Sequence, residues 1–478
     1  MSGEGMRKKG VDLCKVIALL LVFLQHYAGY THFREEREGI VFYSLLTVWR
    51  QFSIICVPLF FIITGFVSSS VQNVKNYKKA QEAFNVYIFY SMVMIWISIS
   101  QNKEIYSLKS LISSMSAVNA GTIGGREWYV RYYILLLFFM PFFNELWNVL
   151  TKKRKKHLLI LLIIITVLPQ SIYGMFGIVT FTMNVSNMIF GVTYFFVGKY
   201  IAEYGVGIKK KQLAAILCMT LAAVSVFYGI VYLSRPANDS TGRISTALIA
   251  VSLFGLLYDI DMSNKIHTFI RWCAGASLDT YLGALALEFL LFNRELSGKA
   301  FFIENLKWLP VVIAVLIVWG NIRTVISKHM FGGGYSFVKR GILTFIMLGI
   351  ICASVLFAKY EYLPEDLLVQ NGVVNEEGVA ATDQGCVTAG PFVNLTPGIW
   401  IAEIYYEAAV EGNYADASYY DQDGEIVQYA SWNLEKGRTC KKIELSVLEG
   451  TVNWEVRTFY NGTGEMIVEK ILLYRLVN

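Results

Sequence analysis

Apolar runs of about 20 residues recur along the chain from Val11 to Phe357, and no other feature limits its fold as strongly. A run of this length crosses the hydrocarbon core of a bilayer as one helix, whereas a soluble domain has no need of many such runs. The composition agrees, since 55% of the 478 residues are hydrophobic and only 16% are charged. The sequence therefore predicts a polytopic α-helical membrane protein.

Hydropathy in windows of about 19 residues predicts ten spans and an eleventh. They lie near residues 11–30, 41–69, 83–100, 129–149, 157–174, 186–203, 211–234, 244–260, 277–293, 309–327 and 341–358. Every second connecting loop is rich in lysine and arginine, as at residues 152–156 and 209–211. Because basic loops stay in the cytoplasm, we expect a multi-pass cell-membrane protein with a cytoplasmic N-terminus. An odd number of spans then places the C-terminal region outside the cell.

The charge and the pattern both change after the last span. Residues 361–478 hold 19 acidic and 7 basic residues, a net charge of −12, while residues 1–360 carry a net +18. Alternation such as Trp400, Ala402, Ile404, with turn sequences such as Asp423-Gly424, predicts an all-β sandwich, jelly-roll-like in form. We expect a membrane domain at 1–340, an eleventh transmembrane helix at 341–358, a linker at 359–388 and an extracytoplasmic sandwich at 389–478. The basic excess belongs to cytoplasmic loops, so no nucleic-acid partner is expected.

The C-terminal region contains no histidine after His329, which excludes Ser-His chemistry there. Its aromatic residues suit a glycan-binding module, although alternation would bury about half of them, and a structural or interaction role stays open. The candidates are Trp400, Tyr405, Tyr406, Tyr419, Tyr420, Trp432 and Trp454. Cys386 and Cys440 could pair in an oxidising exterior, and their pairing is left open. We expect no metal site, because His and Cys lack ligand spacing.

The first span places three ionisable residues on one helix face. Asp12 and Lys15 lie at its cytoplasmic edge, and His26 follows eleven residues later, a rise of roughly 16 Å, close to three full turns. Ionisable residues within a span are costly and mark functional sites. The alternative is that Lys15 anchors the helix and His26 lies at the interface. His32, His157, His267 and His329 lie in loops or at span ends and are interpreted as surface residues.

The same span resembles the opening signature of the acyltransferase family 3 membrane proteins. In that family an Arg or Lys precedes an essential histidine by ten intervening residues, as Lys15 precedes His26. Further similar segments are Val57-Pro58-Leu59-Phe60-Phe61-Ile62-Ile63-Thr64-Gly65-Phe66, Trp128-Tyr129 running to Pro141, Tyr194-Phe195-Phe196-Val197-Gly198-Lys199-Tyr200 and Ser277-Leu278-Asp279-Thr280-Tyr281-Leu282. The resemblance covers about residues 8–330. It departs where Gly283 and Ala284 stand in place of a late histidine, and where a cytoplasmic arginine pair is represented by Lys75 and Lys78.

The resemblance implies transfer of an acyl group, commonly acetyl from cytoplasmic acetyl-CoA, to a hydroxyl of a cell-surface or cell-wall glycan. His26, Lys15 and Asp12 become the candidate catalytic residues, with His26 as general base or transient acyl acceptor. Lys75 and Lys78 lie on the side where the phosphates of the acyl-CoA would approach. We expect no bound cofactor, acyl-CoA as the donor substrate, and membrane lipid and the glycan as partners.

Five further residues are candidates for substrate binding. Arg126 and Glu127 flank Trp128 and Tyr129 at the expected outer edge of the fourth span, and their alternative role is that of an interfacial anchor. Glu288 lies in an apolar run seven residues after Tyr281, on the same helix face.

Two other classes of protein fit a multi-span chain with ionisable residues. A transporter or flippase of a glycan or lipid-linked substrate would show repeat symmetry, and none is detected in the sequence. A sensor or anchor that displays the C-terminal domain would not need His26.

Overall fold

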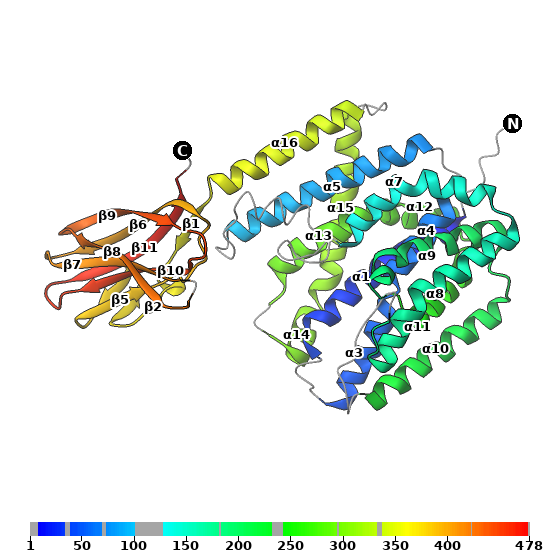
Figure 1. Ribbon diagram of the computed structural model, residues 1–478, viewed down its shortest axis with the longest axis horizontal. Coiled ribbons are helices and arrows are strands. Elements are labelled where there is room, and N and C mark those ends of the chain that lie inside the picture. The colour runs from blue at the N-terminus through cyan, green and yellow to red at the C-terminus, as the bar shows by residue number, and fades with distance from the viewer. Residues whose placement is uncertain are drawn as a thin grey trace. The chain divides into compact units, whose positions relative to one another are not determined.

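The computed structural model describes residues 8–33, 39–68, 73–100, 128–180, 183–231, 242–293, 296–331, 337–421 and 423–476. The chain divides into two compact units. The first is formed by residues 1–87 and 126–341 and the second by residues 88–125 and 342–478. The strands belong to the second unit, as Figure 1 shows.

A helix lies in each of the eleven segments that hydropathy marks as spans. The helices are α1 (Lys9–Tyr30), α3 (Ile40–Ser53), α4 (Cys56–Ser68), α5 (Asn73–Ser100), α7 (Trp128–Val149), α8 (Lys152–Phe176), α9 (Met183–Tyr204), α10 (Lys210–Val231), α11 (Ile244–Leu257), α12 (Asn264–Gly275), α13 (Ser277–Leu291), α14 (Gly298–Asn305), α15 (Trp308–Phe331) and α16 (Phe337–Leu356). The short helices α12 and α14 lie between expected spans and were not predicted.

Five helical segments are by themselves long and apolar enough to cross a membrane, within the part of the chain that the structure describes. They are Lys9–Tyr30, Val41–Ser68, Lys152–Gly174, Lys210–Phe227 and Trp308–Ile326. Large apolar side chains also stay exposed on single helix faces, such as Phe138 and Phe142 on α7 and Ile160 and Ile164 on α8. Apolar surface of this extent is covered by lipid rather than water. The chain is thus a membrane protein, and the count of eleven spans stays a prediction.

The second expected span is two helices, because α3 ends at Ser53 and α4 begins at Cys56. Pro58 explains the break, since proline has no N–H to donate to the carbonyl four residues earlier and its ring crowds that carbonyl. The interruption lies beside α1, which contacts both α3 and α4.

Two glycines let α4 and α9 approach backbone to backbone. A Cβ at Gly65 would lie 1.9 Å from the carbonyl oxygen of Phe195, and a Cβ at Gly198 would lie 2.0 Å from that of Ile62. Small residues allow such close packing of membrane helices. The contact fixes the helix that carries Phe60 and Thr64 against its neighbour.

The second unit contains a β-sandwich. Its strands are β1 (Lys359–Tyr362), β2 (Leu368–Val369), β3 (Gly372–Asn375), β4 (Gly378–Ala381), β5 (Gly385–Ala389), β6 (Gly398–Ala408), β7 (Asn413–Tyr420), β8 (Ile426–Leu434), β9 (Gly437–Val447), β10 (Val452–Tyr460) and β11 (Met466–Arg475). One sheet has the order β3-β4-β11-β6-β9, with β1 also paired to β11, and the other the order β2-β5-β10-β7-β8. Both sheets contribute to one apolar core that contains Trp400, Tyr406 and Trp454. These three aromatic candidates are therefore core residues.

The expectation of a linker at residues 359–388 is wrong, because β1 to β4 and most of β5 lie there. Tyr360 and Tyr362 alternate with exposed neighbours and are buried in the core, as are Val379 and Val387. These strands are two to five residues long, too short for their alternation to stand out among polar and glycine residues. The sandwich thus starts at Lys359, three residues after the end of α16.

The cysteines do not pair. Cys386 lies in β5 of one sheet and Cys440 in β9 of the other, and all seven cysteines of the chain are free thiols in the structure. Burial raises the pKa of the Cys386 thiol to about 11, so it is an unreactive thiol at neutral pH.

Candidate active site

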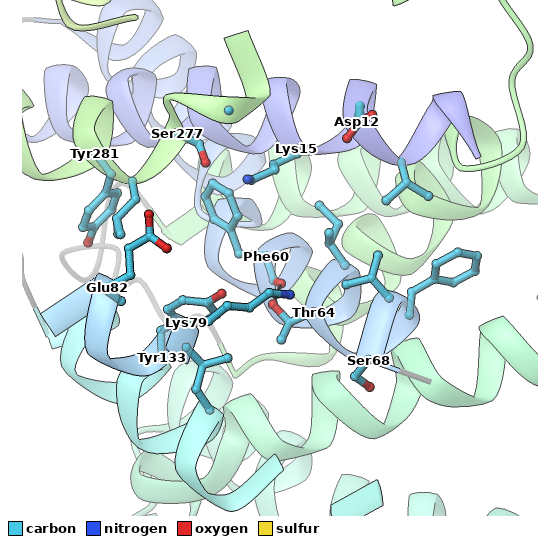
Figure 2. A pocket seen from close by; sticks show the side chains of 18 of the residues that line it. Asp12, Lys15, Phe60, Thr64, Ser68, Lys79, Glu82, Tyr133, Ser277 and Tyr281 are labelled. Carbon is cyan, nitrogen blue, oxygen red and sulfur yellow. Dashed lines mark hydrogen bonds between the residues drawn. The ribbon is translucent and has the colours of Figure 1, made fainter. Parts of the chain in front are cut away.

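A cavity of about 730 Å³ opens within the helical unit, between α1, α4, α5, α7, α13 and α15. Its ionisable lining residues are Lys8, Asp12, Lys15, Lys79, Glu82, Asp279 and Arg323. Its aromatic lining residues are Phe60, Phe66, Tyr129, Tyr133 and Tyr281. Figure 2 shows the Lys15 and Lys79 side chains extending into this space from different helices. Both a polar and an aromatic region are thus available to one ligand.

Helix α1 supplies one wall through its first two turns. Lys8, Val11, Asp12 and Lys15 line the cavity at spacings of three and four residues, which is one face of a helix. The Asp12 carboxylate is 1% exposed, and its Oδ2 lies 3.0 Å from Nε2 of His267. The interpretation of His267 as a surface residue is therefore wrong: the residue lies on α12 and contacts the cavity wall.

A second carboxylate in the wall is held by arginine. Asp279 on α13 is 2% exposed and accepts hydrogen bonds from both Nε and one terminal nitrogen of Arg323 on α15, the latter at 2.9 Å. Two parallel hydrogen bonds fix the guanidinium in one orientation. The Arg323 charge is consequently directed at Asp279, and the lysines supply the positive charge that a ligand would meet.

The basic residues of α5 differ from those that the sequence indicated. Lys78 is exposed and is not among the lining residues, whereas Lys79 lines the cavity together with Glu82. Lys75 lies on α5, but its side chain is outside the described residues. Lys79 is exposed as well, but a rotation of about 100° per residue separates neighbouring positions on a helix, and of the two lysines Lys79 is the one that lines the cavity.

Tyr129 is part of the cavity wall. It is 6% exposed, and its ring packs against Phe60 at 5.5 Å, Phe61 at 5.2 Å and Tyr281 at 5.5 Å between ring centroids. This aromatic group joins α4, α7 and α13, three of the segments that the sequence singled out. Arg126 and Glu127 lie outside the described residues, as does the side chain of Trp128.

His26 lies at the opposite end of α1 and is not among the residues that line the cavity. Lys15 and His26 share a face, with Leu19 and Val22 buried on it between them, over a rise of roughly 16 Å. The structure places Glu288 at the His26 end, because the hydroxyl of Tyr30, one turn after His26, donates to Glu288 Oε2 at 2.7 Å. Five predicted site residues therefore fall into two groups, with Asp12, Lys15 and Tyr129 in the cavity wall and His26 and Glu288 at the other end of α1.

A family model described as an acyltransferase domain matches residues 8–322. The chain belongs to acyltransferase family 3. The match covers the His26 end of α1 and every residue that lines the cavity except Arg323 and Thr324, and it ends before α16 and the sandwich. For this acyltransferase, no curated protein gives a significant match.

Two solved structures are similar to parts of the acyltransferase chain. One is the C-terminal CBM6 of LamC, a marine laminarinase from Zobellia galactanivorans, at 16% identity and a TM-score of 0.21, over 24% of this chain and 99% of that one. The other is BtGH115A, a family GH115 4-O-methyl-α-glucuronidase with specificity for decorated arabinogalactans, at 13% identity and a TM-score of 0.18. It aligns over 57% of this chain and 34% of that one. At these TM-scores neither likeness supports a conclusion about the acyltransferase.

Sequence reasoning missed Lys79 and Arg323 as cavity residues of the acyltransferase, and His267 as the partner of the cavity residue Asp12. Arg323 carried a usable signal, because it is an ionisable residue within an apolar run, the feature that singled out Glu288. His267 and Lys79 carried none, since only the packing of α12 and α5 brings them to the cavity.

Proposed function

We propose that the protein is a membrane O-acetyltransferase that moves an acetyl group from cytoplasmic acetyl-CoA to a hydroxyl of a cell-surface or cell-wall glycan. The observation that carries the proposal is the cavity at the N-terminal end of α1, lined by Lys8, Lys15 and Lys79. The distribution of basic loops predicts that this end of α1 is cytoplasmic. A donor with several phosphates would enter from that side.

The lining suits the two chemically different parts of an acyl-CoA. Ammonium groups bind phosphates as point charges, and three lysines line the cavity. Tyr129, Tyr133 and Tyr281 supply apolar ring faces with polar edges for the less charged arm that carries the thioester. The charge of Asp279 is offset by Arg323, and that of Asp12 is offset when His267 is protonated. Glu82 is a third carboxylate in the lining, so lysines and carboxylates are equal in number there.

Transfer requires the thioester to reach His26. The donor arm would extend along the shared face of α1, past Leu19 and Val22, whose side chains are buried and have to move aside. As general base, His26 takes the proton from the glycan hydroxyl. At the same time the hydroxyl oxygen bonds to the acetyl carbon, and the sulfur of CoA leaves as thiolate. In the alternative, a ring nitrogen of His26 bonds to the acetyl carbon and the sulfur of CoA leaves as thiolate. The glycan hydroxyl then attacks the same carbon, and its proton passes to the released imidazole.

Tyr30 and Glu288 complete the His26 end in this proposal. A hydrogen-bonded carboxylate at a buried position has a fixed orientation, and Glu288 is fully buried. We assign this pair a positioning role toward the acceptor hydroxyl. With eleven spans, the acceptor and the sandwich lie outside the cell, opposite the donor.

Membrane vesicles of opposite orientation test the side of donor entry. Radiolabelled acetyl-CoA, which does not cross the bilayer, is added to inside-out and right-side-out vesicles that contain the full chain. We expect label in the glycan only with inside-out vesicles, which expose the cytoplasmic face. Equal labelling in both orientations would contradict the donor side. No labelling in either, with the protein present and folded, would contradict the reaction.

A further inference from the structure

The five-stranded sheet of the sandwich carries an unusual set of side chains on its outward face. Ala415 and Ala417 of β7 and Trp454 and Val456 of β10 belong to the core. Because side chains alternate along a strand, the residues between them face away from the other sheet. They form rows across the sheet, since Glu455 pairs with Ser418, Arg457 with Asp416 and Phe459 with Tyr414.

A network of printed hydrogen bonds joins the polar members of this face. Arg457 donates to both oxygens of Asp416 at 2.8 Å, and Gln428 of β8 donates to Asp416 Oδ2 at 3.1 Å. Ser418 donates to Glu455 Oε1 at 2.6 Å, and a terminal nitrogen of Arg457 lies 3.7 Å from the same oxygen. Both carboxylates are almost buried, with side-chain exposures of 4% for Asp416 and 10% for Glu455.

Stability alone does not account for this network. Desolvating an ion pair costs about as much as its attraction returns, and apolar residues of the same size would serve a sandwich equally well. The face also holds two carboxylates and one guanidinium, so one negative charge remains. Arg457 is the one basic residue in the five strands β2, β5, β10, β7 and β8. The domain's other seven basic residues, at 359, 436, 438, 441, 442, 470 and 475, lie outside those strands.

Flat aromatic surface adjoins the polar row. The rings of Tyr414 and Phe459 stack at 4.5 Å and 4° between planes, and the Arg457 guanidinium lies over Phe459 at 5.6 Å. Tyr414 is 39% exposed, so part of its ring faces solvent. Exposed aromatic area beside fixed donors and acceptors is a property of ligand sites rather than of a solvated sheet face.

We propose that this face, formed around Asp416, Arg457, Gln428, Glu455 and Tyr414, binds a neutral glycan chain. Sugar hydroxyls both donate and accept, which matches the exposed Gln428 amide and the partly exposed Arg457 guanidinium that the buried Asp416 holds in place. Carbohydrate C–H groups pack on a tyrosine ring. The residual negative charge disfavours an anionic polymer, and the central arginine disfavours a cation.

The other sheet provides a matched comparison. On its outward face Glu403 accepts hydrogen bonds from Lys442 at 2.7 Å, Tyr474 at 2.7 Å and Tyr405 at 3.0 Å. Three donors thus converge on one carboxylate there, whereas donors and acceptors are interleaved around Arg457. A substitution at Tyr405 therefore tests whether any aromatic residue on the sandwich surface has the same effect as Tyr414.

The proposal rests on the proposed function only in taking the bound glycan to be of the class that the enzyme acetylates. The test uses the full chain in lipid nanodiscs, which avoids detergents with sugar head groups. The probes are cellotetraose and chitotetraose as neutral oligosaccharides and polygalacturonate as an anionic one. Binding is measured by biolayer interferometry on the wild type, Tyr414→Ala, Gln428→Ala, Arg457→Lys and the control Tyr405→Ala. Tryptophan fluorescence confirms that each variant is folded.

We expect a neutral oligosaccharide to bind, and Tyr414→Ala and Gln428→Ala each to weaken binding at least about tenfold. Arg457→Lys should weaken it as well, because lysine keeps the charge but not the paired donors. The Tyr405→Ala protein should bind as the wild type does. The proposal is overturned if polygalacturonate is the only probe that binds or if no probe binds. It is also overturned if Tyr405→Ala weakens binding as much as Tyr414→Ala does.

His26→Ala separates this proposal from the proposed function. Its nanodiscs should bind the neutral oligosaccharide as the wild type does, because His26 lies in the other unit. If the wild type binds the oligosaccharide but transfers no acetyl group, the proposed function is wrong and the glycan site is retained. If the wild type transfers acetyl groups but binds no oligosaccharide, only the glycan site is wrong.

Discussion

Oδ2 of Asp12 lies 3.0 Å from Nε2 of His267, a pair that links residues 255 positions apart in the sequence. The contact joins the first turn of α1 to α12 beside the cavity. Asp12 is the more deeply buried partner, at 1% exposure against 17% for the His267 side chain. The pair therefore holds a carboxylate inside the cavity wall and compensates its charge when the imidazole is protonated.

Replacement of His267 by alanine should destabilise the helical unit. The change removes a hydrogen-bonding partner from a buried carboxylate, which costs about 1–3 kcal/mol. We expect a lower thermal unfolding midpoint by several degrees in the purified protein, followed by tryptophan fluorescence. His157→Ala is the control, because His157 is exposed on α8. Asp12→Asn added to His267→Ala should restore part of the loss, and a full loss in the double variant would contradict the pairing.

Lys79 and Lys78 test which face of α5 meets the donor. Lys79→Ala should raise the KM for acetyl-CoA about tenfold with a smaller effect on kcat, because it removes a charge that binds phosphate in ground and transition states alike. Lys78→Ala should leave KM near the wild-type value, since Lys78 is exposed outside the cavity lining. Initial-rate kinetics in inside-out vesicles measure both. An equal rise for the two variants would show that the donor binds elsewhere.

The sequence was sufficient for the long apolar helices and for the β-rich character of the C-terminal region, but not for α12, α14 or the break between α3 and α4. Runs such as 11–30 and 309–327 carry a hydrophobic signal over many residues, which local errors do not erase. The strands from Lys359 to Ala389 did not stand out, because two to five residues contain too few alternations. Their burial depends on pairing with β11 and β10, which lie about 100 and 70 residues away in the chain.

The site was only partly predictable for a similar reason. Helical periodicity alone places Asp12 and Lys15 on one face, and both line the cavity. Periodicity does not give the rotation of α5 or the course of α12, which depend on packing against other helices. Lys79 and His267 thus became visible as site residues only in the folded structure.

Acid should weaken the sandwich through Glu403. Burial acts to raise the pKa of this carboxyl, but hydrogen bonds from Lys442, Tyr474 and Tyr405 outweigh it and hold the pKa below the ordinary 4.5. Because the folded pKa is the lower one, the contribution to stability is present above about pH 4.5 and is lost as the pH falls through the folded value. Unfolding by urea at pH 6 and at pH 3.5 measures the effect.

Glu403→Gln should reduce the difference in stability between those two pH values. Glu361→Gln serves as the control, because Glu361 is half exposed in its pair with Lys470 and its charge is better solvated. The prediction is contradicted if the Glu403→Gln protein and the wild type lose the same stability on acidification.

Acetyl esters on the surface glycan of cells that express the His26→Ala protein provide the most direct test of the proposed reaction. With membrane levels equal to the wild type and to the exposed-histidine control His157→Ala, we expect the ester content to fall at least about 100-fold, the effect of removing a general base or nucleophile. Esters at the wild-type level in His26→Ala cells, beside controls that clearly acetylate, would contradict the role of His26 and with it the proposed mechanism.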